Sequence, residues 1–177
     1  VTPFLGITGS DDGGRVYADA RYYRSFGAND RVTFAVRGQV GSVWGADLMS
    51  APRDFLFYSG GGGTVRGQPY QDLGIDITRD FGSGPEDIRI GGRSFVGVQA
   101  EARVGITQNI GVVAFYDFGA IDIDPLPDAD SDWHAGAGIG VRYDTAIGPI
   151  RLDLATPVSG DDAWDSVQVY IGIGQAF

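Results

Sequence analysis

Arg66 has the clearest capacity for specific binding chemistry, because it stands in an unusual loop-forming stretch, residues 54–74. Four consecutive glycines, Gly60 to Gly63, precede it, and no strand or helix tolerates such a run, since each glycine loses backbone entropy and offers no side chain to pack. A flexible linker would lack the aromatic residues that flank the run, which are Phe55, Phe57, Tyr58 and Tyr70. The composition predicts a long loop that folds back and docks through Arg66, whose planar guanidinium can grip a carboxylate with two hydrogen bonds and stack on a ring.

Other chemistry finds little support in the residue types. The chain has no cysteine, which excludes disulfides and thiolate metal sites, and its single histidine, His134, cannot form a zinc cluster. A nucleophile–histidine–acid set would have to use His134, and no Gly-x-Ser-x-Gly motif is present, so we expect neither an enzyme nor a cofactor. One acidic loop offers oxygen ligands without the calcium-loop spacing, which favours a solvated external loop: Asp122, Asp124, Asp128, Asp130 and Asp132.

Length and charge limit the class of protein and its partners. With 177 residues, the chain is one domain or part of one. The formal net charge of −10 argues against nucleic acid, whose phosphates need basic patches. No run of about 18 apolar residues could form a transmembrane helix, and no signal peptide is recognisable. Because the chain starts with Val1 rather than Met, we expect further residues upstream.

The elements that must position Arg66 are predicted to be β-strands. Apolar and polar residues alternate in segments of about ten residues separated by turn residues, with almost no helical periodicity. The expected segments are the strand end within 2–9, then 15–24, 31–44, 95–106, 110–120, 133–144, 149–157 and 167–177, with a turn at 10–14 and the long loop from about 45 to 92. Hairpin-type connections without crossover helices predict one antiparallel sheet of about eight strands.

The alternation also predicts which side chains share a face. In segment 95–106, Glu101 lies on the polar face, opposite Val98 and its apolar neighbours. In segment 110–120, Phe115 and Asp117 lie on the corresponding face, one strand away from Glu101.

Alternation alone does not decide which face meets solvent. A soluble barrel or sandwich turns its apolar face inward, whereas a membrane barrel turns it outward into lipid. Charged residues in mid-strand fit a wet lumen, although they fit the outer face of a soluble sandwich equally well. They are Glu101, Arg103, Asp117, Arg142, Asp144, Arg151 and Asp153.

Two further features favour the membrane. Short connections (27–30, 107–109, 146–148) alternate with longer ones (45–92, 122–132, 159–165), as in outer-membrane barrels, with the short loop 10–14 as an exception. Aromatic residues gather near strand ends, as in interfacial girdles: Tyr22, Phe26, Trp44, Trp133, Tyr143, Trp164 and Phe177.

Several motifs, in their order and spacing, give the chain a family resemblance over nearly its whole length. Residues 64–70, Thr-Val-Arg-Gly-Gln-Pro-Tyr, look like a Val-Arg-Gly-(Phe/Tyr) loop motif, and residues 115–119, Phe-Tyr-Asp-Phe-Gly, look like a Phe-x-Asp-x-Gly strand motif. Segments 91–94, 101–103 and 138–145 fit the family pattern in matching order along the chain. The chain resembles the C-terminal half of the barrel of the BamA/TamA outer-membrane assembly superfamily, the bacterial surface antigen family. Segments 148–154 and 173–177 look closest to its TamA branch.

The resemblance implies an all-β fold, an antiparallel transmembrane β-barrel of 16 strands preceded by POTRA domains. Residues 1–177 would be its C-terminal portion, with about eight strands and a lumenal arginine loop at about 45–92. An open half-sheet cannot face lipid, so the other half of the barrel, closure on itself or a homodimer of half-barrels would have to complete it.

The resemblance also implies a docking site and a gate. Arg66 would pair with Asp117 beside Phe115 inside the lumen, in a docking set formed by Arg66, Gly67, Tyr70, Glu101, Phe115, Asp117 and Gly119. The last strand would carry the insertion signal and form the lateral gate through Ile171, Ile173 and Phe177, with Gln175 where an apolar or aromatic residue is more usual.

The implied function is assembly or translocation of client proteins, autotransporters among them, in the bacterial outer membrane. Membrane lipid or lipopolysaccharide, client outer-membrane proteins and a periplasm-spanning accessory protein would be the partners. The alternative is a passive outer-membrane pore or adhesin barrel, which would not require Arg66 or Asp117.

Overall fold

The computed structural model describes residues 1–177 except 6–10, 81 and 83. Within the described chain, eight strands form one antiparallel sheet in the order β1-β2-β3-β6-β7-β8-β9-β10. They are β1 (Thr2–Phe4), β2 (Gly13–Phe26), β3 (Val32–Trp44), β6 (Ser94–Gly105), β7 (Ile110–Asp122), β8 (Asp132–Tyr143), β9 (Ile150–Pro157) and β10 (Gln168–Ile173). Two short 3₁₀ turns lie in the connections, η1 (Ala28–Asp30) between β2 and β3 and η2 (Arg53–Phe55) after β3. The predicted antiparallel all-β fold is confirmed. None of the described residues belongs to a helix with the length and apolarity needed to cross a membrane.

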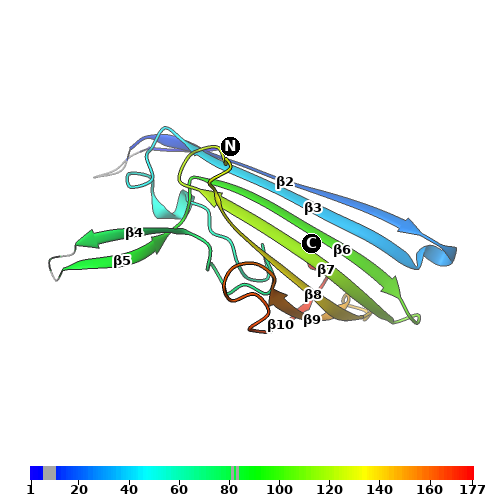
Figure 1. Cartoon of the computed structure of the whole chain (residues 1–177). Coiled ribbons are helices and arrows are strands. Elements are labelled where there is room, and N and C mark those ends of the chain that lie inside the picture. The colour runs from blue at the N-terminus through cyan, green and yellow to red at the C-terminus, as the bar shows by residue number, and fades with distance from the viewer. Residues whose placement is uncertain (6–10, 81, 83) are drawn as a thin grey trace.

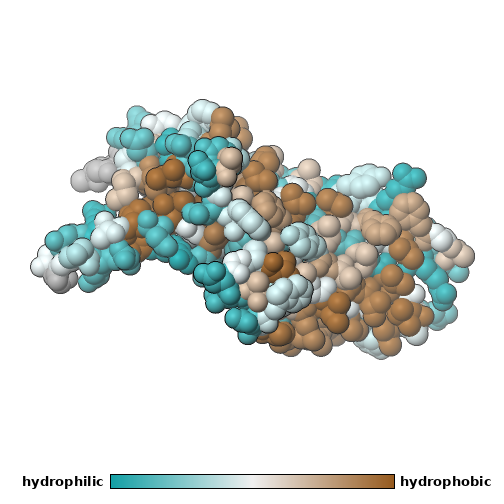
Figure 2. Space-filling view, in the orientation of Figure 1, coloured by the Kyte–Doolittle hydropathy of each residue, from teal (hydrophilic) through white to brown (hydrophobic). Residues whose placement is uncertain are grey.

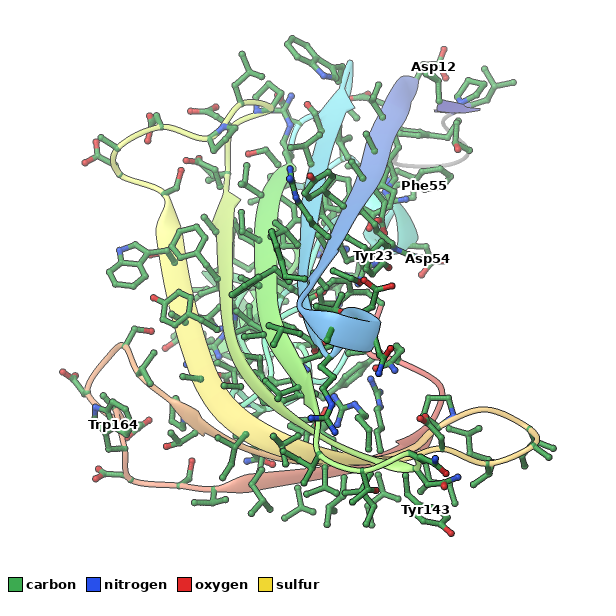
Figure 3. All side chains as sticks on the ribbon, turned by 90° about the vertical axis from the view of Figure 1, so that its right-hand side faces the viewer. Asp12, Tyr23, Asp54, Phe55, Tyr143 and Trp164 are labelled. Carbon is green, nitrogen blue, oxygen red and sulfur yellow. The ribbon has the colours of Figure 1, made fainter. Side chains whose placement is uncertain are left out.

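The sheet curls into a trough, whose concave side we call the lumenal face (Figure 3). Its edges are formed by β1 with β2 at one side and by β10 at the other. Because β1 pairs with Gly13 to Arg15, the longer remainder of β2 forms most of the first edge in the described part of the chain. The sheet therefore has the form of a partial barrel.

The two faces of the sheet differ in the way that a membrane barrel requires. Apolar side chains on the outer face are exposed, with 64% of Ile139 and 53% of Val40 accessible. On the lumenal face, polar side chains such as Gln99, Asp117 and Asp153 are buried. Figure 2 shows hydrophobic side chains gathered over the wall, while the projecting hairpin is mostly hydrophilic. This distribution inverts that of a soluble sandwich, so the outward apolar face is suited to lipid.

The connections lie as the alternation of their lengths predicts. Short turns join β2 to β3, β6 to β7 and β8 to β9 at one end of the trough, which is the right-hand end in Figure 1. The connections β3–β6, β7–β8 and β9–β10 lie at the other end. Of the predicted strand within 2–9 and turn at 10–14, residues 6–10 lie outside the described residues.

The long segment 45–92 contains a hairpin that the alternation of apolar and polar residues does not predict. Strands β4 (Ile75–Asp80) and β5 (Pro85–Ile90) pair as a separate hairpin that projects beyond the sheet (Figure 1). Ile75, Ile77 and Ile88 pack against an apolar cluster at this end. That cluster comprises Phe4, Val43, Ala46, Leu48, Ala51, Leu56, Phe57, Ile90, Phe95 and Ile121. The segment is thus a loop with its own hydrophobic core and a hairpin, not a single irregular excursion.

The end of the chain corrects one prediction. Strand β10 ends at Ile173, and Gly174 then adopts a φ of 95°, which turns the backbone out of the strand. Phe177 consequently lies on the lumenal face, with its ring centroid 6.4 Å from that of Tyr23, and not on the outer face with Ile171. The predicted strand 167–177 was therefore too long, because alternation was extended through a glycine that breaks it.

Candidate functional site

Arg66 is buried on the lumenal face and contacts three strands at once. Its Nε donates to Asp117 Oδ2 at 2.7 Å and its Nη2 donates to Asp117 Oδ1 at 2.9 Å, which is the two-pronged grip typical of arginine. Its Nη1 donates to Glu101 Oε1 at 2.6 Å and to Asp153 Oδ2 at 3.4 Å. The guanidinium carbon lies 3.6 Å from the centroid of the Phe115 ring, so the cation also stacks on an aromatic face.

The charges around Arg66 form a buried network. Arg103 bonds Glu101 at 2.7 Å, and Arg142 bonds Asp153. Three cations therefore face three anions: Arg66, Arg103 and Arg142 against Glu101, Asp117 and Asp153. Burial acts to lower the pKa of Arg66, but the hydrogen bonds and charges of Asp117 and Glu101 outweigh it and hold that pKa above its usual value. The loop cation therefore stays charged where it docks.

A stripe of glycines on β8 gives the loop backbone room to reach the wall. An added Cβ at Gly136 would collide with the carbonyl oxygen of Arg66. An added Cβ at Gly138 would collide with the ring of Phe115, and one at Gly140 with the carboxylate of Asp153. The lumenal side of this strand is thus filled by groups from other segments.

The loop itself turns through glycines. Gly60, Gly61 and Gly67 have φ values of 114°, 88° and 94°, which side chains rarely adopt. The amide of Gly61 donates to the carbonyls of Val65 at 3.0 Å and Gln68 at 3.1 Å, so the loop closes on itself around Arg66. A Cβ at Gly67 would lie 2.5 Å from the carbonyl oxygen of Thr156 on β9, which makes glycine necessary at the closest approach.

The whole chain, residues 1–177, matches the Omp85 superfamily domain. The chain belongs to the Omp85 superfamily. Its structure is similar to the crystal structure of BamA from Haemophilus ducreyi lacking POTRA domains 1–3, with a TM-score of 0.68 and 19% sequence identity. The likeness covers 89% of this chain and 33% of that BamA chain, so the present chain spans about a third of its length. Family membership and the outward apolar face place this chain in the bacterial outer membrane.

Most of the predicted docking residues of this Omp85 chain lie together. The structure brings Gly67, Glu101, Phe115 and Asp117 around Arg66, and an added Cβ at Gly119 would meet the side chains of Ser59 and Val65 from the loop.

Tyr70 is the exception among the predicted docking residues, because 79% of it is exposed. The amide of Gly61 donates to the carbonyl of Gln68, two residues before Tyr70, and an added Cβ at Gly61 would lie 3.2 Å from the Tyr70 ring, so this ring lies beside the glycine turn of its own loop. Ile171 and Ile173 lie exposed on the outer face of β10, apart from the docking site.

Four further anchors of the Omp85 loop were not predicted. Arg37 of β3 donates to the carbonyl of Gly63 at 3.1 Å and to Gln99 at 3.0 Å, while Asp19 of β2 accepts from its Nε at 2.9 Å. The other three anchors pair Ser59 with His134 (2.7 Å), Gln68 with the carbonyl of Ala135 (3.0 Å), and the amide of Gly67 with the hydroxyl of Tyr170 (3.1 Å). The polar face of β3 was a signal for Arg37, but contacts to a loop carbonyl leave no pattern in the sequence.

These contacts define what the site can do chemically. Its cation is matched by carboxylates on β6, β7 and β9, so the site holds a loop in place. Among the residues that the structure describes, no group of three or more histidines or carboxylates is arranged to hold a metal ion.

Proposed function

We propose that this Omp85 chain is part of a barrel that inserts or translocates client proteins, autotransporters among them, in the outer membrane. The observation that carries the proposal is the docking of a long loop on the lumenal face through buried Arg66. A passive pore would not require a buried loop arginine, whereas this chain covers part of its lumenal face with a segment held by an ion-pair network. The role is non-enzymatic, and its partners are client outer-membrane proteins, lipid or lipopolysaccharide, and a periplasmic accessory protein.

The position of the chain in the barrel is part of this proposal. We assign it to the C-terminal half of a 16-stranded barrel of the TamA branch, with β10 as one side of a lateral gate and Ile171, Ile173 and Phe177 as its insertion signal. Within the described residues, β10 and the part of β2 beyond Arg15 each have one side without a partner strand, which supports the assignment because backbone groups that face lipid must be paired. A first half of the barrel, or a second copy of this chain, would supply the missing partners.

The oligomeric state of this chain refolded in detergent tests the closure. A dimer supports closure by a second copy, and a compact monomer that migrates faster before heating than after supports closure of the eight strands alone. If the chain needs the first half of the barrel, it will migrate at the same position before and after heating until that half is added. A monomer that stays soluble without detergent contradicts the membrane assignment.

Client assembly tests the function itself. The full-length barrel is reconstituted in liposomes, and insertion of an autotransporter client is followed by protease protection. We expect Arg66→Lys to slow insertion, because lysine cannot bond both oxygens of Asp117, while Arg89→Lys on the projecting hairpin leaves it unchanged. Equal insertion by the two variants would reject the proposal in favour of a passive pore or adhesin.

A further inference from the structure

Tyr170 links the docked loop to the last strand of the sheet. Its hydroxyl accepts a hydrogen bond from the amide of Gly67 at 3.1 Å and donates one to the carbonyl of Gln68 at 3.4 Å. Its ring packs against a small cluster formed by Val113, Phe115 and Ala155. Phe115 of β7 is also the ring on which Arg66 stacks. Tyr170 therefore contacts both the backbone of the loop and the ring against which the loop arginine is docked.

Residues 168–173 of β10 have few other ties to the rest of the molecule, whereas the chain end after them is held by the bond from Gly174 to Pro149 and by Phe177 beside Arg103 and Tyr23. It pairs with β9 over Gln168 to Ile173, and its other side is an edge of the sheet. Its outward side chains, Val169, Ile171 and Ile173, are exposed. On the lumenal side, Gly172 has no side chain to pack, which leaves Gln168 and Tyr170 as the inward side chains of this strand.

The orientation of Gly67 makes the bond to Tyr170 sensitive to loop docking. Gly67 follows Arg66 directly, and a Cβ on it would collide with the backbone of Thr156 on β9. Its amide can therefore reach the Tyr170 hydroxyl when Arg66 is seated against Asp117, and a shift of the loop would carry the amide away.

We propose that Tyr170 couples docking of the arginine loop to pairing of β10 with β9, so that a seated loop holds the last strand in register against β9. The proposal rests on the function proposed above, in which β10 is one side of the gate. Thermodynamic linkage makes the effect reciprocal. Unpairing of β10 lowers the equilibrium constant for loop docking by the same factor as undocking of the loop lowers the equilibrium constant for β10 pairing. Tyr170 is thus a positioning residue for the gate strand.

Hydrogen–deuterium exchange of the full-length barrel in lipid nanodiscs tests the coupling. Exchange is followed in peptides covering 59–70 (loop) and 168–173 (β10), in the parent protein, Tyr170→Phe, Arg66→Lys and the double variant. We expect Tyr170→Phe to raise opening of both segments about fivefold, the size of one lost neutral hydrogen bond, because the bond to Gly67 at 3.1 Å is short and the bond to Gln68 at 3.4 Å is long and weak. Arg66→Lys should open β10 as well as the loop. Compared with Tyr170→Phe alone, the double variant should show faster exchange in the loop peptide and unchanged exchange in the β10 peptide.

Controls and contrary outcomes are defined by the same peptides. Tyr116→Phe removes a hydroxyl from an exposed tyrosine on the outer face of β7 and should change neither segment. If Arg66→Lys does not fold, Gln68→Ala loosens the loop by removing its bond to Ala135. The coupling is wrong if the loop variant leaves β10 unchanged, or if the two effects on β10 simply add. Client insertion, measured on the same samples, separates the two proposals. If the exchange data show coupling but insertion is unaltered in the variants, the proposed function is rejected and the coupling stands.

Discussion

Arg66 sends both its side chain and its own backbone amide to one oxygen of Asp117, with Nε at 2.7 Å and the amide at 3.1 Å from Oδ2. The carboxylate thereby fixes the conformation of the loop backbone as well as the position of the guanidinium. Lysine would restore the charge but not the paired grip, which is why arginine is specifically required here.

Removing the loop cation should destabilise the barrel strongly. We expect Arg66→Ala to lower the free energy of unfolding by about 3–5 kcal/mol, because it leaves the buried carboxylate of Asp117 without its cation. Urea unfolding of the barrel in liposomes measures the change. Arg89→Ala, which removes an exposed ion pair with Asp76, should cost about 0–1 kcal/mol. Similar losses of stability in the two variants would show that the loop is not docked in the membrane-embedded barrel.

Even alanine should lower the stability of the barrel when it replaces a glycine of the stripe on β8. Gly136→Ala places a methyl group against the carbonyl of Arg66, and overpacking of this kind costs about 1–3 kcal/mol. The matched control is Gly38→Ala on the outer side of β3, where nothing lies within 4 Å of an added Cβ. Protease cleavage of the loop should rise for Gly136→Ala alone. Unchanged cleavage in both variants would contradict the close contact between loop and β8.

A charged side chain on the lipid-facing side of the sheet should lower the free energy of unfolding. We expect Ile139→Arg, on the outer face of β8, to cost about 2–4 kcal/mol if the residue lies near the bilayer midplane. Ile147→Arg makes the same change in the exposed turn between β8 and β9 and should be tolerated. Unfolding in liposomes distinguishes the two. Tolerance of arginine at both positions would argue that this face does not meet lipid.

The projecting hairpin should respond to acid in a defined direction. The hydrogen bond from Arg89 holds the pKa of Asp76 below its usual value. This pair therefore contributes stability above the ordinary pKa of an aspartate, and the contribution is lost as pH falls through the lowered pKa. NMR titration of Asp76 should show the lowered pKa in the parent protein and a return toward the ordinary value in Arg89→Gln. An identical titration in both would reject the pairing.

The sequence predicted the strands and one face of the site for a physical reason. Alternation has a period of two in any strand, so it placed Glu101, Phe115 and Asp117 on one face without knowledge of the loop. The partner Arg66 came from a family motif, because no periodicity connects a loop residue to a strand 51 residues away.

The missed features lack such a periodic signal. The hairpin of β4 and β5 buries a few isoleucines on short strands, too few for alternation to stand out from an irregular loop. Asp153 was predicted to face the lumen, but its proximity to Arg66 depends on the curvature of the sheet. The position of Tyr70 depends on a backbone turn within the loop, so its place in the motif could not tell which side it faces.

The bare lumenal side of β8 has a consequence for permeability. Where Gly136, Gly138 and Gly140 carry no side chains, the seated loop and its neighbours serve as the lining of the wall. Withdrawal of the loop would uncover polar backbone and a cluster of fixed charges to water. Ionic conductance across a membrane containing the barrel would therefore report, in real time, whether the loop is seated or withdrawn.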